Sequence, residues 1–167
     1  MADAGLSVTV RLARPDDLPQ LQDLLEELRE NATPGVVWKR ADDERARAVW
    51  AQILKDGRRV FLIAEVGGEV VGTADLLIVP NLTHTGRPWA TLENVVVDPE
   101  WRNQGIGKAL MHHAMKEAEQ AGCHKLQLAS SSHRTRAHRF YEKLGFERSA
   151  VAYRLKFCTE VKEPGAA

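Results

Sequence analysis

Apolar and polar residues follow regular periods along the first third of the chain. Val8 to Ala13 alternates apolar with polar residues, as a half-buried strand does. Pro15 suits the first turn of a helix. We expect this helix to end at Thr33-Pro34-Gly35, and a second helix to run from Asp42 to Lys55. The apolar stripe of the first helix, at helical spacing, is Leu18, Leu21, Leu24, Leu25 and Leu28.

The middle of the chain has the composition of strands. Val60 to Val66 and Val70 to Val79 are β-rich runs. Between them, Gly67-Gly68-Glu69 indicates a short hairpin. The polar stretch from Asn81 to Pro88 predicts a loop, and Trp89 to Val97 is the next expected strand.

Helical and strand patterns alternate in the last third of the chain. A helix is expected from about Gly105 to Ala121, with Gly122 as its left-handed stop. Lys125 to Ala129 predicts a short strand, and a further helix is expected to run through Leu144. One or two final strands are expected within Val151 to Cys158. Hairpin strands followed by a β-α-β-α-β portion predict an α+β or mixed α/β sheet.

Composition narrows the class of protein. A length of 167 residues favours a single domain, and 44% hydrophobic residues are enough for one sizeable core. Lys plus Arg and Asp plus Glu both number 23, so the net charge calls for neither nucleic acid nor an anionic membrane as partner. No apolar run approaches the roughly 20 residues of a membrane span. The tail from Glu160 to Ala167 is expected to be disordered.

Localisation and metal binding are predicted from small features. The segment from Met1 to Gly5 lacks the charged and apolar regions of a secretory signal. Cys123 and Cys158 do not suggest a disulfide framework and are expected to be free, buried thiols. His112 and His113 are adjacent on the expected helix and point in different directions, so they lack the spacing with which two histidines bind one metal ion. These features predict a cytoplasmic protein without a metal.

The residues Arg102 to Lys108 read Arg-Asn-Gln-Gly-Ile-Gly-Lys and join the apolar strand at Leu92 to Val97 to the start of a helix. The glycines let a ligand approach the backbone, and the N–H groups and dipole of a first helical turn favour an anion. A phosphate or pyrophosphate is the expected ligand of the N–H groups from Gln104 to Ala109. A nucleotide triphosphatase loop is absent, and Leu110 stands where the dinucleotide fingerprint needs a third glycine.

Two segments carry a recognisable pair of motifs. Val97 to Leu110 reads Val-Asp-Pro-Glu-Trp-Arg-Asn-Gln-Gly-Ile-Gly-Lys-Ala-Leu. Ala137 to Phe146 reads Ala-His-Arg-Phe-Tyr-Glu-Lys-Leu-Gly-Phe. In sequence, order and spacing they resemble the acetyl-CoA-binding motif and the later Phe-Tyr-Glu-Lys segment of the GNAT N-acetyltransferases. In element order the resemblance covers about Val8 to Phe157, within one N-acetyltransferase domain over residues 1–167.

The resemblance implies a fold and a co-substrate. The GNAT fold has a central, mostly antiparallel sheet that splays after the acetyl-CoA-binding strand, with helices on both faces. Acetyl-CoA would be the co-substrate, and its pantetheine would pair with the main chain of that strand. Arg134 departs from the family pattern, because many relatives carry Asn there; an arginine would hold a CoA phosphate or an anionic group of the substrate. The expected cofactor-binding residues are Val95, Val96, Val97, Arg102, Asn103, Gln104, Gly105, Ile106, Gly107, Lys108 and Arg134.

Two side chains are candidates for catalytic proton transfer. Tyr141, a phenol with an ordinary pKa of about 10, can protonate a departing thiolate, and the resemblance implies that it faces the CoA sulfur. Its alternative role is packing. Glu93 is the candidate base, because burial in an apolar strand would raise its pKa towards a useful value. Its alternative is to face solvent or to pair with an arginine. Asn94 is expected on the opposite face of the strand.

These residues predict an N-acetyltransferase in which an amine attacks acetyl-CoA directly. The expected acceptor is a small-molecule amine. Ala121 to Lys125, Phe140 to Phe146 and Leu92 to Asn94 are similar to glucosamine-6-phosphate N-acetyltransferases. An amino-sugar phosphate or other anionic amine would suit Arg134, Arg136 and Arg87. A peptide or protein amine, and a non-catalytic acyl-CoA-binding regulator, are the alternatives. The resemblance also implies a homodimer, with the apolar run Val151 to Phe157 as a candidate edge.

Overall fold

The structure is a computed structural model that describes residues 7–30, 41–153 and 155. Its strands are β1 (Thr9–Leu12), β2 (Arg59–Val66), β3 (Glu69–Val79), β4 (Trp89–Val97) and β5 (Leu126–Leu128). Its helices are α1 (Leu18–Glu30), α2 (Asp43–Lys55), α3 (Ile106–Gln120) and α4 (Thr135–Lys143). Short 3-10 turns are η1 (Pro15–Asp17), η2 (His84–Gly86) and η3 (Pro99–Trp101).

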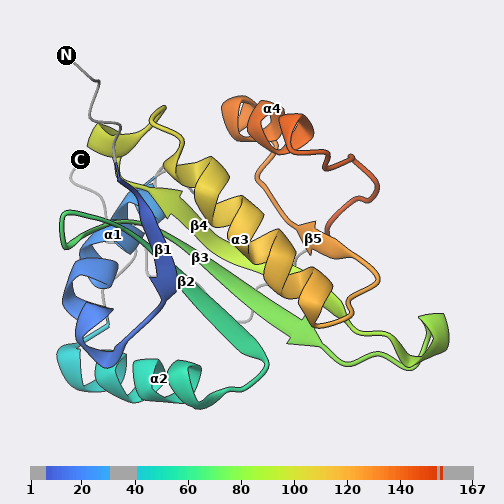
Figure 1. The fold of residues 1–167 in the computed structure, drawn as a ribbon, viewed down its shortest axis with the longest axis horizontal. Helices are drawn as coiled ribbons and strands as arrows, with labels where there is room; N and C mark the ends of the chain where they lie inside the picture. Colours follow the sequence, from blue (N-terminus) through green and yellow to red (C-terminus); the bar gives the residue numbers. More distant parts are fainter. Residues whose placement is uncertain (1–6, 31–40, 154, 156–167) are drawn as a thin grey trace, which may run out of the picture.

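The strands form one sheet in the order β1-β2-β3-β4-β5 (Figure 1). Neighbouring strands are antiparallel except β4 and β5, which run parallel. The pairing of β4 with β5 covers only Ala90 to Leu92 against Leu126 to Leu128. Residues 93–97 of β4 therefore have no ladder partner on β5. The expected mixed α/β sheet, mostly antiparallel and splayed along β4, is confirmed.

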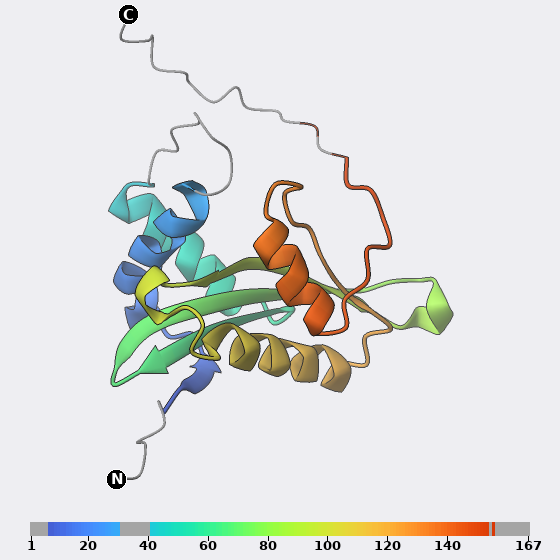
Figure 2. The same cartoon turned by 90° about the horizontal axis from the view of Figure 1, so that it is seen from above.

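Helices cover both faces of the sheet, with α1 and α2 on one side and α3 on the other (Figure 2). On the first face the buried cluster includes Leu21, Leu24, Trp50, Phe61, Ile63 and Val96. On the second face it includes Leu62, Leu76, Ile106, Leu110 and Met111, with Phe140 and Tyr141 of α4 packed against its edge. Alternate residues of β2 enter different clusters, as the two-residue period of a strand requires.

The start of α3 lies unusually close to the sheet at Gly72 of β3. A Cβ atom there would lie 3.0 Å from Leu110 Cδ1, 3.2 Å from the Val96 carbonyl oxygen and 3.3 Å from Ile106 Cγ2. A Cβ there would press on all three atoms, so glycine allows the closest approach. Gly72 therefore lets the first turns of α3 rest against β3 and β4, next to the glycine-containing loop.

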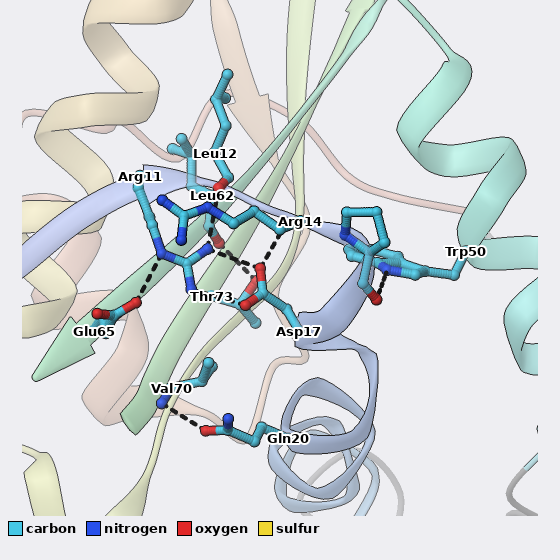
Figure 3. A network of polar contacts seen from close by, with 11 residues as sticks. Arg11, Leu12, Arg14, Asp17, Gln20, Trp50, Leu62, Glu65, Val70 and Thr73 are labelled. Atoms are coloured by element: carbon cyan, nitrogen blue, oxygen red, sulfur yellow. Dashed lines mark hydrogen bonds and ion pairs between the residues drawn. The ribbon is translucent and has the colours of Figure 1, made fainter. Parts of the chain in front are cut away.

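A polar network fixes the chain between β1 and α1 (Figure 3). Arg11 donates to Glu65 of β2 at 2.8 Å and makes two 2.8 Å hydrogen bonds to the Asp17 carboxylate, which also accepts the Arg14 N–H at 2.6 Å. Burial alone would raise the pKa of Asp17, but the hydrogen bonds from Arg11 and Arg14 outweigh it and lower that pKa. The ionised carboxylate is therefore part of the folded structure.

The structure differs from the sequence-based expectations at the ends of elements. The first helix begins with the 3-10 turn η1, and β5 is shorter than the expected strand from Lys125 to Ala129. Val151 to Tyr153 are not in a strand, so the expected final strand is wrong over these residues. Thr33 to Gly35 and residues 156–167, with Cys158 and the tail, lie outside the described residues.

Cys123 is a half-buried free thiol, and burial raises its pKa. Among the described helices, none combines the length and the apolar character that crossing a membrane requires.

Candidate active site

A β-bulge interrupts β4 where it leaves β5. Asp75 pairs with Glu93 and Thr73 pairs with Val96, so Ala74 of β3 faces two residues of β4 instead of one. The extra residue is taken up at Asn94, whose φ of 51° is left-handed. Asparagine tolerates this conformation better than most residues. The bulge shifts the phase of β4, so that Val95 and Val97 pack on the α3 side and Val96 on the α1 side.

The bulge is tied to a buried ion pair on the neighbouring strands. Asp75 of β3 is 1% exposed and makes hydrogen bonds of 2.9 and 2.5 Å with the Arg59 guanidinium of β2. These hydrogen bonds raise the pKa of Arg59, against the opposing effect of burial. The Asn94 side-chain amide donates to the same carboxylate at 3.2 Å. Asn94 thus reaches the face that carries Asp75 and Glu93, and its expected place on the opposite face is wrong because the bulge breaks the alternation.

The loop between β4 and α3 has the geometry of an anion site. Asn103 and Gly105 have φ values of 66° and 86°, and Gly105 directly precedes the first turn of α3. The N–H groups of Ile106, Gly107 and Lys108 lack intrahelical acceptors. The Ala109 N–H, which was expected to bind the phosphate as well, instead donates to the Gly105 carbonyl at 3.0 Å. Gln104 turns away, since its amide donates to the Glu100 carbonyl at 3.1 Å, and the Ile106 side chain is 1% exposed and belongs to the core. These two residues can offer only backbone N–H groups to a ligand.

Arg102 is held by two other elements in this structure. Its Nε donates to the Val97 carbonyl at the end of β4 at 2.9 Å. Its terminal nitrogen lies 3.3 Å from the Glu27 carboxylate of α1. The guanidinium therefore bridges the strand, the loop and α1 across the mouth of the splayed sheet.

A cavity of about 860 Å³ opens along this loop. It lies between the free end of β4, the loop and α4, and α1 contributes Glu27 and Leu28. Its wall is strongly basic, and Glu27 is the one carboxylate among its described lining residues. Such a wall suits a ligand with several negative charges. The basic lining residues are Arg102, Lys108, Arg134, Arg136, Arg139 and Lys143.

A second cavity, of about 680 Å³, adjoins the first. Both are lined by Leu28, Val95, Arg134 and Tyr141, so they meet at the bulge. Glu93 lines only the second cavity and is exposed, and it interacts with other groups. The expected burial of Glu93 is therefore wrong. The rest of the polar wall of the second cavity is Asn94, Ser130, Ser131, Ser132 and Tyr153.

Tyr141 stands at the junction of the two cavities. Its ring packs against Phe140 and Phe146, with centroids 5.4 and 6.0 Å away. Burial raises the pKa of Tyr141, and the positive charge of Arg134 offsets only part of this rise. The phenol is therefore protonated at neutral pH and able to donate a proton.

The structure brings most of the predicted site residues to one place. Val95, Val96, Val97, Arg102, Asn103, Gly105, Gly107, Lys108, Arg134 and Tyr141 all line the first cavity. Gln104 and Ile106 do not, and Glu93 lies on the second cavity only. Sequence reasoning missed Arg139, Lys143 and the three consecutive serines as cavity walls. The sequence shows the spacing of the basic residues on α4, but the residues next to them do not indicate whether that face of the helix points into the cavity.

The fold and the paired cavities define a class of protein: a mixed α/β protein whose split sheet carries a basic cavity, which suits an anionic ligand, next to a second cavity. A family model described as the acetyltransferase (GNAT) family matches residues 20–146. The chain belongs to this family, whose members use acetyl-CoA, and it is an N-acetyltransferase.

Relatives agree with this assignment. A glucosamine 6-phosphate N-acetyltransferase of Trypanosoma brucei brucei is 40% identical over 101 residues, covering 58% of this chain and 67% of the relative. An aminoalkylphosphonate N-acetyltransferase of Salmonella typhimurium is 35% identical over 109 residues, covering 65% and 70%. A crystal structure of a Trypanosoma brucei acetyltransferase has a TM-score of 0.73 and 31% identity, over 90% of this chain and 100% of that one.

Proposed function

We propose that this chain transfers the acetyl group of acetyl-CoA to the primary amine of a small molecule that also carries a phosphoryl group. One observation carries the proposal. The basic cavity and the second cavity meet at Val95 and Tyr141, and Glu93 lies only on the second side. A thioester at the junction would have a proton donor beside its sulfur and a carboxylate on the side from which an amine enters.

The first cavity supplies groups for each part of acetyl-CoA. The pyrophosphate would accept hydrogen bonds from the first turn of α3, with Lys108 adding positive charge. The pantetheine would run along residues 95–97 of β4, whose outer edge has no strand partner on β5. The Val97 carbonyl already accepts the Arg102 Nε–H, so a pantetheine amide would use its second lone pair.

The reaction would be a direct transfer. The neutral amine attacks the thioester carbonyl carbon, a C–N bond forms, and backbone N–H groups at the bulge near Val95 stabilise the oxyanion. The C–S bond then breaks, and the Tyr141 hydroxyl protonates the departing thiolate. The proton lost by the amine passes to Glu93, directly or through a water molecule. The protons balance, because Glu93 gains the proton that the amine loses and Tyr141 gives one proton to the thiolate.

The second cavity supports an acceptor with a phosphoryl group. The Arg134 guanidinium, which lines it, makes no hydrogen bond or ion pair with another described residue. Ser130 lines this cavity, and its buried Oγ has no hydrogen-bond partner among the described residues; Ser131 and Ser132 lie beside it. An arginine fork and hydroxyl donors recognise phosphate and phosphonate oxygens well. The glucosamine 6-phosphate and the aminoalkylphosphonate N-acetyltransferases described above are named for amines that carry such a group.

Matched acceptors test this proposal. Thiol release from acetyl-CoA is measured with glucosamine 6-phosphate against glucosamine, and with phosphoethanolamine against ethanolamine. Hydrogen bonds to a charged group contribute about 1.5–3 kcal/mol. We therefore expect kcat/KM to favour the phosphorylated member of a pair by roughly tenfold to a hundredfold. Arg134→Met should remove this preference while leaving the slow reaction of the neutral amine.

The same assay separates the alternatives. Turnover of N-terminal peptides above every small amine would assign a peptide acceptor instead. An absence of thiol release with every amine, in a protein that binds acetyl-CoA, would assign a non-catalytic acyl-CoA-binding role. Equal kcat/KM values for both members of each pair would mean that the protein is an acetyltransferase whose acceptor needs no phosphoryl group.

A further inference from the structure

A buried ion pair lies behind the bulge of β4. The Asp75 carboxylate is 1% exposed and lies on the face of the sheet that α1 and α2 cover, where its register partner Phe61 belongs to the apolar cluster. Both carboxylate oxygens accept hydrogen bonds from the Arg59 guanidinium. Withdrawing two charges from water opposes folding, and apolar residues of similar size often stabilise a protein as well as such a pair does. A buried ion pair at this place therefore points to a role besides stability.

The third partner of this carboxylate is the Asn94 side chain. Its amide donates to Asp75 at 3.2 Å, and its backbone has a left-handed φ of 51°. Asn94 and Val95 have no register partner where β4 pairs with β3 or with β5. A residue other than glycine keeps a left-handed conformation when the surrounding structure holds it there. Because ladder pairing does not hold Asn94, the hydrogen bond to Asp75 restrains the bulge.

The bulge separates two groups that the proposed reaction uses. Glu93, the candidate base, comes directly before Asn94, and Val95, whose N–H would stabilise the oxyanion, comes directly after it. Val95 lines both cavities, and Glu93 lines the second. A change in the dihedral angles of Asn94 would turn these two groups relative to each other. Since a displacement of about 1 Å can cost about a hundredfold in rate, the conformation of Asn94 bears directly on catalysis.

Arg59 also balances the charges beside the bulge. Asp75 and Glu93 are directly opposite each other on β3 and β4, and like charges so placed repel. The pKa of Arg59 is raised mainly by its hydrogen bonds to Asp75, and the negative charge of Glu93 adds to this rise. The guanidinium is thus stabilised by both carboxylates and offsets their repulsion. The ion pair can therefore hold Asn94 without leaving an uncompensated negative charge next to the candidate base.

We propose that Arg59 and Asp75 are positioning residues for the acetyl transfer. Through the Asn94 amide they hold the bulge, so that the Val95 N–H reaches the thioester oxygen while the Glu93 carboxylate reaches the amine. Arg59 and Asp75 are not among the described lining residues of either cavity, so they act through Asn94 and not on a ligand. This inference rests on the proposed acetyl transfer and gives a function to two residues away from the reacting atoms.

Two variants remove this restraint in different ways. Arg59→Met combined with Asp75→Leu replaces the ion pair by apolar side chains and leaves the Asn94 amide without its acceptor. Asn94→Gly keeps a residue that readily adopts a positive φ but removes the amide. Asp17→Asn is the matched control, because Asp17 is also a buried carboxylate paired with an arginine, and it lines neither cavity.

Steady-state kinetics test the inference together with the infrared band of bound acetyl-CoA, isotope-labelled at the thioester carbonyl and recorded without an amine. A hydrogen bond from the bulge weakens the C=O bond, so the wild type should show this band at a lower frequency than free acetyl-CoA does. Both variants should shift the band back towards the free ligand and lower kcat about tenfold or more, with the KM for acetyl-CoA within about twofold. The control should unfold at a lower temperature with wild-type kcat and band position.

A folded double variant with the kcat and band of the wild type would overturn the inference, and so would a wild-type band equal to that of free acetyl-CoA. If the double variant does not fold, Asn94→Gly decides. An unchanged band in Asn94→Gly, even with a lower kcat, would mean that Asn94 contacts only the acceptor, which also overturns the inference. If the wild type shows the shifted band but acetylates no phosphoryl-bearing amine, the proposed acceptor is wrong while the positioning of the thioester stands.

Discussion

Replacing Gly72 with alanine tests how the sheet sets the position of the loop. The added methyl group would lie 3.0 Å from Leu110 Cδ1, 3.2 Å from the Val96 carbonyl oxygen and 3.3 Å from Ile106 Cγ2. The leucine can shift by rotation, but the carbonyl belongs to the backbone of β4 and cannot. Relief requires β3 to shift relative to both the Val96 carbonyl of β4 and the Ile106 side chain of α3, whose first turn follows the loop directly.

The cost can be bounded from these contacts. Overpacking a close-packed core by a methyl group costs about 1–3 kcal/mol. Alanine recovers about 0.5–1 kcal/mol relative to glycine within a strand. The expected net loss of unfolding free energy therefore lies between about 0 and 2.5 kcal/mol, with a midpoint of about 1 kcal/mol. For a chain of this size each kcal/mol lowers Tm by about 2–4 °C, so Tm should fall by about 2–4 °C at this midpoint. Affinity for CoA should fall with it, because the N–H groups of the loop move.

Thermal unfolding and calorimetry with CoA measure both effects. The matched control is Gly57→Ala, since Gly57 has no atom within 4 Å of the Cβ position. This control should be neutral or slightly more stable than the wild type. Stability of Gly72→Ala equal to that of Gly57→Ala would refute the argument that close packing at Gly72 holds α3 in place.

Three further substitutions address catalysis and stability. Tyr141→Phe should lower kcat by about a hundredfold or more while acetyl-CoA affinity changes little, since a general acid contributes 10²–10⁴-fold; unchanged turnover would remove Tyr141 from proton transfer. Glu93→Gln should depress the rate mainly at lower pH, where amines hold their protons, and a uniform loss at all pH values would argue against a base. Asp17→Asn should cost about 3 kcal/mol at neutral pH. The pKa of Asp17 is lowered in the folded state, so the difference in unfolding free energy between the wild type and Asp17→Asn should be complete above about pH 5. It should shrink as the pH falls below about 4, where the carboxyl of the unfolded chain takes up its proton. A difference that grows in acid would contradict the sign of this linkage.

Local patterns were enough to predict most of the sheet. The hairpin of β2 and β3 follows from two β-rich runs around Gly67-Gly68, and the mixed topology follows from the order of elements. The glycine-containing loop at Arg102 to Lys108, between strand and helix, was predictable because strand, glycines and helix start are adjacent in sequence. These features depend on neighbouring residues, which is why one sequence suffices to find them.

The bulge at Asn94 was not predictable in the same way. Its stability depends on Asp75 and Arg59, which come from two other strands, and its left-handed φ has no strong local signature apart from the asparagine itself. The exposure of Glu93 follows from the parting of β4 and β5 after Leu92, which is a property of the sheet and not of the strand. Likewise, the direction of the basic face of α4 depends on the contact of Phe140 with Gly107.

The central claim is that a phosphoryl-bearing amine takes the acetyl group at the junction beside Tyr141. The most direct measurement is mass spectrometry of the acceptor, combined with thiol titration, after incubation of the protein with acetyl-CoA and glucosamine 6-phosphate or phosphoethanolamine. The account predicts one N-acetylated amine for each free CoA thiol. Thiol release no faster than in the absence of amine, with every acceptor, would contradict it.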